Sequence, residues 1–354
     1  MFSRSLLIFA TAISLAASVF AGGNEGLSVK ERRQERSRLR KIKQMYEQYP
    51  SAKDRWPSRP KTGRAEKHTL RHQDREREYF VYVPSKLDPA GPAPLFFVLH
   101  GGGGEARSME VLVTNFRFNE LADRHGFIVV YPQGVDKSWN DGREADIIKA
   151  DRQEIDDVGF FGKMINELRE EFEIDPARIC VTGMSNGGFM SFRLGRELTG
   201  TVTAIAPITA TIPQAAFAKY DKVRPPVSLL LINGTEDPLV PYEGGAVKVG
   251  FLERGKTMST TDSVEKFADL NGCRNGPEEE LLKDRVPEDG LRISRKVYTS
   301  CRDNVRVELL SVIGGGHTWP GGLEILPERI VGRTCHDISA ADYVVRFALG
   351  LDNN

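Results

Sequence analysis

The hexapeptide Gly183-Met184-Ser185-Asn186-Gly187-Gly188 is the stretch that decides the fold prediction. It follows the apolar run 178–182, which predicts a buried strand, and it precedes 189–194, which predicts the start of a helix. A Gly-x-Ser-x-Gly sequence between a strand and a helix is typical of a nucleophile elbow, a sharp turn that presents a serine hydroxyl at the top of a sheet. Such a pattern also occurs by chance in glycine-rich loops, so the rest of the chain must supply the partners of Ser185.

Apolar runs alternate with helical patterns on both sides of the hexapeptide. Runs of this kind without polar alternation predict strands that are buried on both faces of a sheet. The sequence therefore predicts an α/β fold with a mostly parallel central sheet and helices on both faces. The expected strands are 95–99, 127–131, 202–208, 227–232 and 305–313, with an antiparallel strand at 75–84, and the expected helices are 115–125, 156–172, 261–271 and 339–349.

Composition and the N-terminus predict an exported protein with three segments. The chain of 354 residues has 49 basic and 49 acidic side chains, so its net charge indicates no acidic or basic partner. Arg4, the apolar run 6–20 and the small-residue site Val19-Phe20-Ala21 predict a signal peptide over 1–21 and a secreted or periplasmic location. A membrane anchor is the alternative, although the run is shorter than the roughly 20 residues that a span needs. A basic tail over 22–67 and a catalytic domain over 68–354 complete the partition.

The tail carries a local excess of positive charge. Residues 30–43 contain eight lysines and arginines against Glu31 and Glu35. A solvated tail is one interpretation, and contact with an anionic surface is the other. We expect no nucleic-acid partner, because neither aromatic interleaving nor a nucleic-acid motif accompanies the charge.

Ser185 needs a base, and the base needs an orienting group. Asp237 follows the predicted strand 227–232, and His317 follows the predicted strand 305–313. Because the carboxyl ends of parallel strands meet at one edge of the sheet, both side chains are expected near Ser185. The order Ser, Asp, His is that of the α/β-hydrolase fold. Glu236 and, less well, Asp262 are the rivals of Asp237.

Two backbone N–H groups are expected to form an oxyanion hole. One belongs to Asn186, the residue after the serine, and the other to the glycine run that follows strand 95–99. Gly102 is the first choice there and Gly103 the second. His100 is expected to support this loop by hydrogen bonding.

The substrate-facing wall is predicted from residues in polar loops. Trp139, Asn140, Asp141 and Trp319 are the candidates, with ordinary loop packing as the alternative for the tryptophans. Asp156 and Asp157 are interpreted as helix N-cap residues.

Four cysteines stand in a chain that is expected to meet an oxidising compartment. Cys273 and Cys301 flank a polar segment, and a bridge between them would stabilise the fold by roughly 3–4 kcal/mol. Cys180 lies within the strand before the serine and is expected to be a buried free thiol. Cys335 has no assigned partner, and three connectivities stay open.

Taken together, the motifs resemble those of secreted polyhydroxybutyrate depolymerases and of feruloyl and acetylxylan esterases (carbohydrate esterase family one). The motifs are 99–103, 139–140, 156–160, 182–188 and 315–322. The resemblance implies an α/β-hydrolase fold, a Ser185–Asp237–His317 triad, no metal or cofactor, and a Cys273–Cys301 disulfide. It implies an ester substrate, either a polyester oligomer or an acylated polysaccharide.

Some features depart from the resemblance. Gly102 stands where several relatives carry cysteine, and Asn233 stands where histidine is common before glycine. No substrate-binding domain follows the hydrolase region, which favours a soluble or oligomeric ester. A serine peptidase of the prolyl-oligopeptidase type and a non-catalytic binding protein on a hydrolase scaffold are the alternative functions, and adhesion through the basic tail is a third.

Overall fold

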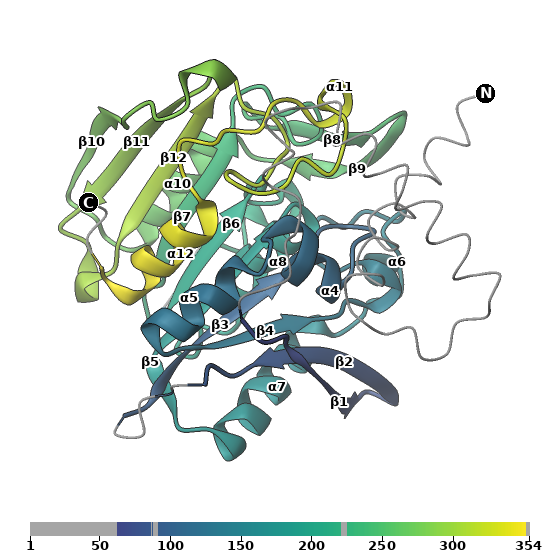
Figure 1. The fold of residues 1–354 in the computed structure, drawn as a ribbon. Coiled ribbons are helices and arrows are strands. Elements are labelled where there is room, and N and C mark those ends of the chain that lie inside the picture. The colour runs from purple at the N-terminus through teal and green to yellow at the C-terminus, as the bar shows by residue number, and fades with distance from the viewer. Residues whose placement is uncertain (1–61, 86, 88–90, 221–224, 352–354) are drawn as a thin grey trace.

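The computed structural model describes residues 62–85, 87, 91–220 and 225–351. Ten strands form one sheet in the order β1-β2-β4-β3-β5-β6-β7-β12-β11-β10 (Figure 1). The central strands pair in parallel, which confirms the predicted mostly parallel sheet. These central strands are β4 (Ile128–Pro132), β3 (Ala93–Leu99), β5 (Ile174–Met184), β6 (Ala204–Ile208), β7 (Ser228–Gly234) and β12 (Val307–Ile313).

Antiparallel strands extend both edges of the sheet. β1 (Glu66–His72) and β2 (Arg75–Tyr82) lie at one edge, and β11 (Arg292–Thr299) and β10 (Asn275–Leu281) lie at the other. β1 begins within the range expected for the tail, so the folded part starts earlier than residue 68. β10 lies in the segment expected to be only a polar excursion. Every residue of β10 is exposed, so it lacks the apolar alternation that reveals a half-buried strand.

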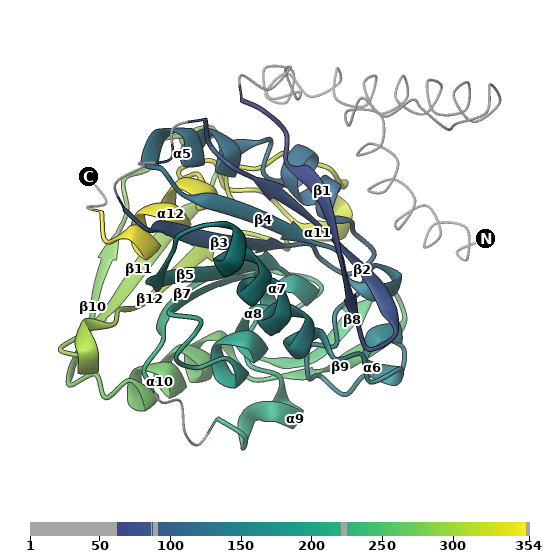
Figure 2. The same cartoon turned by 90° about the horizontal axis from the view of Figure 1, so that it is seen from below.

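Helices cover both faces of the sheet, as predicted. α5 (Arg117–His125) and α12 (Ala340–Leu349) lie side by side on one face (Figure 1). α7 (Asp157–Glu171), α8 (Asn186–Glu197) and α10 (Thr260–Leu270) cover the other (Figure 2). β3 shows why the central strands are unbroken apolar runs in the sequence. Phe96 and Val98 pack under α5 and α12, while Leu95 and Phe97 pack under the opposite helices.

Shorter elements connect the strands and the long helices. Strands β8 (Gly245–Val249) and β9 (Leu252–Thr257) form a separate antiparallel hairpin. In the described part of the chain, no helix combines the length and apolar character needed to span a membrane. The short helices are α4 (Ala106–Ser108), α6 (Lys149–Arg152), α9 (Gln214–Phe217) and α11 (Glu328–Val331), and helical turns occupy Met109–Val113, Val135–Lys137, Pro287–Asp289 and Arg302–Asn304.

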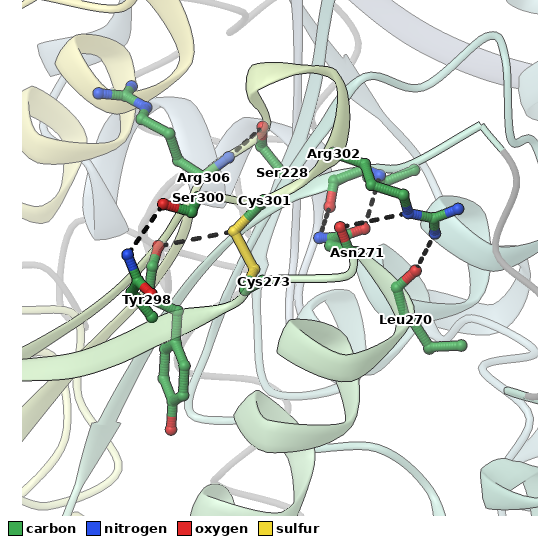
Figure 3. Close-up of a disulfide and its surroundings, with 11 residues drawn as sticks. Ser228, Leu270, Asn271, Cys273, Tyr298, Ser300, Cys301, Arg302 and Arg306 are labelled. Carbon is green, nitrogen blue, oxygen red and sulfur yellow. Dashed lines mark hydrogen bonds between the residues drawn. A yellow bond between two sulfur atoms is a disulfide. The ribbon is translucent and has the colours of Figure 1, made fainter.

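A disulfide joins Cys273 and Cys301, as the resemblance implied (Figure 3). It links the chain after α10 to the end of β11 across a sequence separation of 28 residues. Cys180 and Cys335 are buried free thiols, which confirms the expectation for Cys180 and leaves Cys335 unbridged. The predicted signal peptide and residues 30–43 of the predicted basic tail lie outside the described residues.

Candidate active site

Ser185 occupies the turn between β5 and α8, where the sequence predicted an elbow. Its backbone angles are φ 56° and ψ −119°, a conformation that costs free energy for any residue with a side chain. The turn is tied to the neighbouring strand end, because the Ser185 N–H donates to the Ile208 carbonyl at 2.9 Å. Ser185 therefore stands at the carboxyl end of β5, where it lines a cavity.

The glycines around Ser185 are required by close backbone contacts. A Cβ atom on Gly183 would lie 2.7 Å from the Gly187 carbonyl carbon, and one on Gly187 would lie 2.6 Å from the Leu99 carbonyl oxygen. A Cβ atom on Gly188 would lie 2.7 Å from the Ala210 Cβ atom. These distances are shorter than van der Waals contact, so any larger residue would push α8 away from the sheet. The sequence pattern thus reflects the tight packing of helix and sheet at the elbow.

Asp237 and His317 form a buried pair at the same edge of the sheet. The His317 Nδ1 atom lies 2.7 Å from the Asp237 Oδ2 atom. The other carboxylate oxygen, Oδ1, accepts the N–H groups of Leu239 and Val240, each at 2.8 Å. Three interactions therefore hold the carboxylate in place, and its contact with Nδ1 leaves Nε2 as the ring nitrogen for chemistry. The two residues meet because β7 and β12 are parallel neighbours.

The rivals of Asp237 lie in other environments. The side chain of Glu236 is 69% exposed, and its carboxylate lies 3.8 Å from Arg333. The N–H of Asp262 donates to the N-cap serine of α10, Ser259. Neither carboxylate pairs with His317, so Asp237 is the acidic partner of the imidazole in this structure.

The glycine-rich loop after β3 faces the elbow. A Cβ atom on Gly101 would lie 3.6 Å from the Ser185 Cβ atom, and one on Gly102 would lie 3.6 Å from the Asn186 Cβ atom. The Gly103 N–H is already used, because it donates to the Lys137 carbonyl at 2.7 Å. The geometry therefore favours Gly102 over Gly103 as the loop donor beside Asn186.

His100 supports this loop from below. Its Nδ1 atom donates to the Gly101 carbonyl at 2.8 Å, and its Nε2 atom accepts the Gly134 N–H at 3.0 Å. Burial lowers the pKa of His100 to about 4, so the imidazole is neutral in this tautomer at neutral pH. Both ring nitrogens are occupied by the backbone, which matches the predicted supporting role.

A cavity of about 320 Å³ joins these parts. Ser185, His317, Gly102 and Asn186 all line it, together with the β8–β9 hairpin. Aliphatic and methionine side chains form much of the remaining wall, and it contains no phenylalanine, tyrosine or tryptophan among the described residues. The aliphatic lining residues are Met109, Val113, Ile147, Ile148, Met184, Leu239, Val240, Val247, Val249 and Leu326.

Comparison with known proteins identifies the family. No family model matches the chain. The putative esterase NocK of Nocardia uniformis is 32% identical over 289 residues, which cover 78% of this chain and 80% of NocK. Feruloyl esterase B of Piromyces equi is 28% identical over 68% of this chain and 42% of its own length. Poly(3-hydroxyalkanoate) depolymerase C of Paucimonas lemoignei is 26% identical over 69% of this chain and 58% of its own length.

The chain belongs to this family of esterases. It is therefore a carboxylic ester hydrolase with the α/β-hydrolase fold, and its suspected resemblance is confirmed. The esterase spans most of NocK but only about half of the other two relatives, so their substrates are not transferred to it directly.

Trp139, Asn140 and Trp319, which were predicted to face the substrate, do not line the cavity that contains Ser185. Trp139 is fully buried, its ring lies beside His100, and its indole N–H donates to the His100 carbonyl. Asn140 donates its side-chain N–H to the Ile155 carbonyl at 2.9 Å. Trp319 is 4% exposed and packs against Phe118. A tryptophan in a polar loop has the same local sequence whether it faces a cavity or the core, so only packing distinguishes the two.

The loop that contains Trp139 and Asp141 instead braces the elbow. Asp141 is buried and pairs with Arg143, whose nitrogen Nη2 lies 2.7 Å from Asp141 Oδ2. The same carboxylate accepts the side-chain N–H of Asn186. Asp156 caps α7 as predicted, accepting the Gly159 N–H at 2.9 Å.

Asp157 does not share this capping role. It lies in a buried ion pair with Arg77, whose Nη2 atom is 2.6 Å from its Oδ1 atom. Its second oxygen accepts the Asn140 N–H at 2.8 Å. The prediction that both aspartates are N-caps is therefore corrected for Asp157.

Sequence reasoning missed the β8–β9 hairpin and the arginines of the cavity. Val247 and Val249 line the cavity from one strand, and Arg254 lines it from the other. Arg143 reaches the same cavity from the loop after Trp139. The alternation of Val247 and Val249 after Gly244 and Gly245 is the sequence signal that would have revealed a strand there.

Proposed function

We propose that this esterase is an exported serine hydrolase that cleaves esters through a covalent acyl-enzyme, with Ser185 as nucleophile, His317 as general base and Asp237 as its orienting acid. The observation that carries the proposal is the buried 2.7 Å contact between Asp237 and His317 at the edge of a cavity that Ser185 also lines. Membership of an esterase family supports the same reaction class.

In the first half of the reaction, His317 Nε2 takes the proton of the Ser185 hydroxyl as Oγ attacks the ester carbonyl carbon. The carbonyl oxygen becomes an oxyanion, which accepts the backbone N–H groups of Gly102 and Asn186. The imidazolium of His317 is stabilised by the Asp237 carboxylate. It then gives its proton to the leaving alkoxide, and the acyl group stays on Oγ.

In the second half, water takes the place of the alcohol. His317 accepts a proton from the water, whose oxygen attacks the acyl carbon. The second oxyanion occupies the same pair of N–H donors, and collapse returns the proton from His317 to Ser185 Oγ. The products are a carboxylic acid and the free enzyme.

The proposed substrates are polyester oligomers or acylated polysaccharides. Feruloyl esterase and depolymerase names among the relatives support these two classes. The predicted signal peptide supports export, and residues 30–43 are proposed to contact an anionic surface. A cavity of about 320 Å³ suits a short acyl group and the first unit of the alcohol.

The test compares wild type with Ser185→Ala and with a control variant, Ser300→Ala. Ser300 is an exposed serine that does not line the cavity. Wild type and the control should hydrolyse 4-nitrophenyl butyrate and react covalently with a fluorophosphonate probe, whereas Ser185→Ala should do neither while keeping its circular dichroism spectrum. Retained turnover in Ser185→Ala would refute the proposal. Faster cleavage of a matched amide than of the ester would favour the peptidase alternative, and a wild type that the probe does not label would favour a binding protein.

A further inference from the structure

Arg254 is a cation without a partner in the catalytic cavity. It lies on β9, and its side chain lines the cavity beside Ser185 and His317. Its Nε atom is buried and has no hydrogen-bond partner. Among the described residues, the ion pairs at this wall involve Lys137, Arg143 and Lys149 and do not include Arg254. Arg143 in the same cavity differs, because it pairs with Asp141 at 2.7 Å. Of the two arginines that line the cavity, Arg254 is thus the one whose guanidinium is available to bind a ligand.

The position of Arg254 is next to the predicted oxyanion hole. Its Nη1 atom lies 3.6 Å from the point where a Cβ atom of Gly102 would stand, and that point is also 3.6 Å from the Asn186 Cβ atom. The backbone of Arg254 is held as well, because its carbonyl accepts Arg143 Nη1 at 3.3 Å. A group that meets this guanidinium would therefore lie close to the scissile ester.

The surroundings of Arg254 favour the binding of an anion in the cavity. A partly buried charge without a partner costs free energy, which a bound anion offsets. Burial lowers the pKa of Arg254, and the nearby charge of Arg143 lowers it further, so the charged form of Arg254 is disfavoured until an anion binds beside it. Three other cations line the cavity, and each has a carboxylate beside it: Lys137 pairs with Glu105, Arg143 with Asp141 and Lys149 with Asp136. Among the described residues, Arg254 is therefore the cation of this wall that has no carboxylate partner.

We propose that Arg254 binds a carboxylate carried by the substrate close to the scissile bond, so that the enzyme prefers anionic esters to neutral esters of the same shape. The guanidinium offers a planar pair of N–H donors that matches a carboxylate. The aliphatic remainder of the wall suits a short carbon chain between the ester and the charge. This inference rests on the proposed function, because it concerns the substrate of the same serine.

The carboxylate can belong to either half of the ester. On the acyl side, the substrate is a monoester of a dicarboxylic acid. On the alcohol side, it is an ester of a hydroxy acid, such as the acid end of a hydroxyalkanoate oligomer. Both halves place a carboxylate a few bonds from the carbonyl that Ser185 attacks.

The experiment uses two matched pairs of esters. Mono-4-nitrophenyl glutarate and its neutral primary amide report the acyl side. The butanoyl ester of 3-hydroxybutanoate and its neutral primary amide report the alcohol side. Wild type, Arg254→Met, Arg254→Gln and Lys256→Met are compared by kcat/KM on all four, because Lys256 is an exposed cation on the same strand that does not line the cavity.

We expect both Arg254 variants to lower kcat/KM for the anionic member of one pair by about 10- to 100-fold, with the neutral member unchanged. Lys256→Met should behave as wild type, and free glutarate should inhibit wild type more strongly than Arg254→Met. An equal loss on neutral and anionic esters would overturn the proposal and assign Arg254 to the oxyanion itself. Unchanged selectivity in the variants would also overturn it. Failure of wild type to cleave any of the four esters would instead count against the proposed function.

Discussion

The side chain of Asn186 clamps the backbone of Trp139 from both sides. Its Oδ1 atom accepts the Trp139 N–H at 2.8 Å, and its Nδ2 atom donates to the Trp139 carbonyl at 3.0 Å. Residue 186 therefore has two parts with separate roles. The backbone N–H is the proposed oxyanion donor, while the side chain fixes the loop that carries Asp141 and Arg143.

Asn186→Ala should separate these two roles. The backbone N–H stays, but two buried polar groups of Trp139 lose their partners. We expect the free energy of unfolding to fall by about 1–3 kcal/mol, measured by urea denaturation, together with a lower kcat on a neutral ester. Unchanged stability would show that water or a neighbouring residue replaces the clamp.

Asp237→Asn should preserve the fold and reduce the rate. The amide oxygen can still accept the N–H groups of Leu239 and Val240, but it cannot stabilise an imidazolium on His317. We expect kcat for 4-nitrophenyl butyrate to fall by roughly 10³- to 10⁴-fold with little change in melting temperature. Glu236→Gln is the matched control and should keep wild-type kcat. The reverse pattern would make Glu236 the acid.

The buried imidazole of His100 should make the protein sensitive to acid. Its folded pKa of about 4 lies below the ordinary value of 6.5, so the folded state resists protonation. Its contribution to stability is fully present above pH 6.5 and is lost as the pH falls through 4. Between pH 7 and 4, wild type should lose roughly 2–3 kcal/mol of unfolding free energy more than His100→Asn does. His68→Asn, on β1, should follow wild type, and parallel curves for wild type and His100→Asn would contradict the prediction.

Asp151 should act in the opposite direction. Burial and then the carboxylate of Asp141 raise the pKa of Asp151 to about 7. A folded pKa above the ordinary 3.8 means that the folded state binds the proton more tightly. The stability from this group is present in full below pH 3.8 and is lost as the pH rises through 7. From pH 5 to 8, wild type should lose roughly 1–3 kcal/mol relative to Asp151→Asn, measured by urea denaturation. A constant difference would disprove the shift.

Removal of the disulfide should destabilise the fold without affecting the chemistry. Cys273 and Cys301 are 28 positions apart, so a Cys273→Ser, Cys301→Ser double variant frees a loop of that length in the unfolded chain. We expect the unfolding free energy to fall by about 3–4 kcal/mol in non-reducing buffer. Wild type in reducing buffer is the control and should match the variant. Equal stability of both forms in non-reducing buffer would argue that the bridge does not form.

Local patterns were enough to predict the parallel sheet and the residues that end its strands. A strand buried on both faces has no polar positions, and 95–99 and 227–232 are such runs in the sequence itself. Once the strands are parallel, Ser185, Asp237 and His317 follow strands whose carboxyl ends share an edge. The glycines at 183, 187 and 188 could also be interpreted from the sequence, because each lies at a close contact that leaves no room for a side chain.

Edge strands and loop side chains were not predictable in this way. β10 is exposed along its whole length, so no alternation reveals it. Trp139 and Trp319 lie in polar segments, yet both are buried, because their neighbours in space come from distant parts of the chain. Asp157 is separated by 80 positions from Arg77, its buried partner, and nothing in the local sequence couples them.

The sequence by itself determined the class of fold, the serine of the elbow and the order of its expected partners, because these depend on short-range periodicity and on glycine at close contacts. Only the tertiary structure decided which walls face the substrate. It placed the β8–β9 hairpin over the elbow, turned Trp139 into the core and left Arg254 without a partner beside Gly102. Those outcomes depend on contacts between segments far apart in the chain. Packing and the pairing of buried charges decide which side chains are buried and which face the cavity, and the local sequence does not distinguish them.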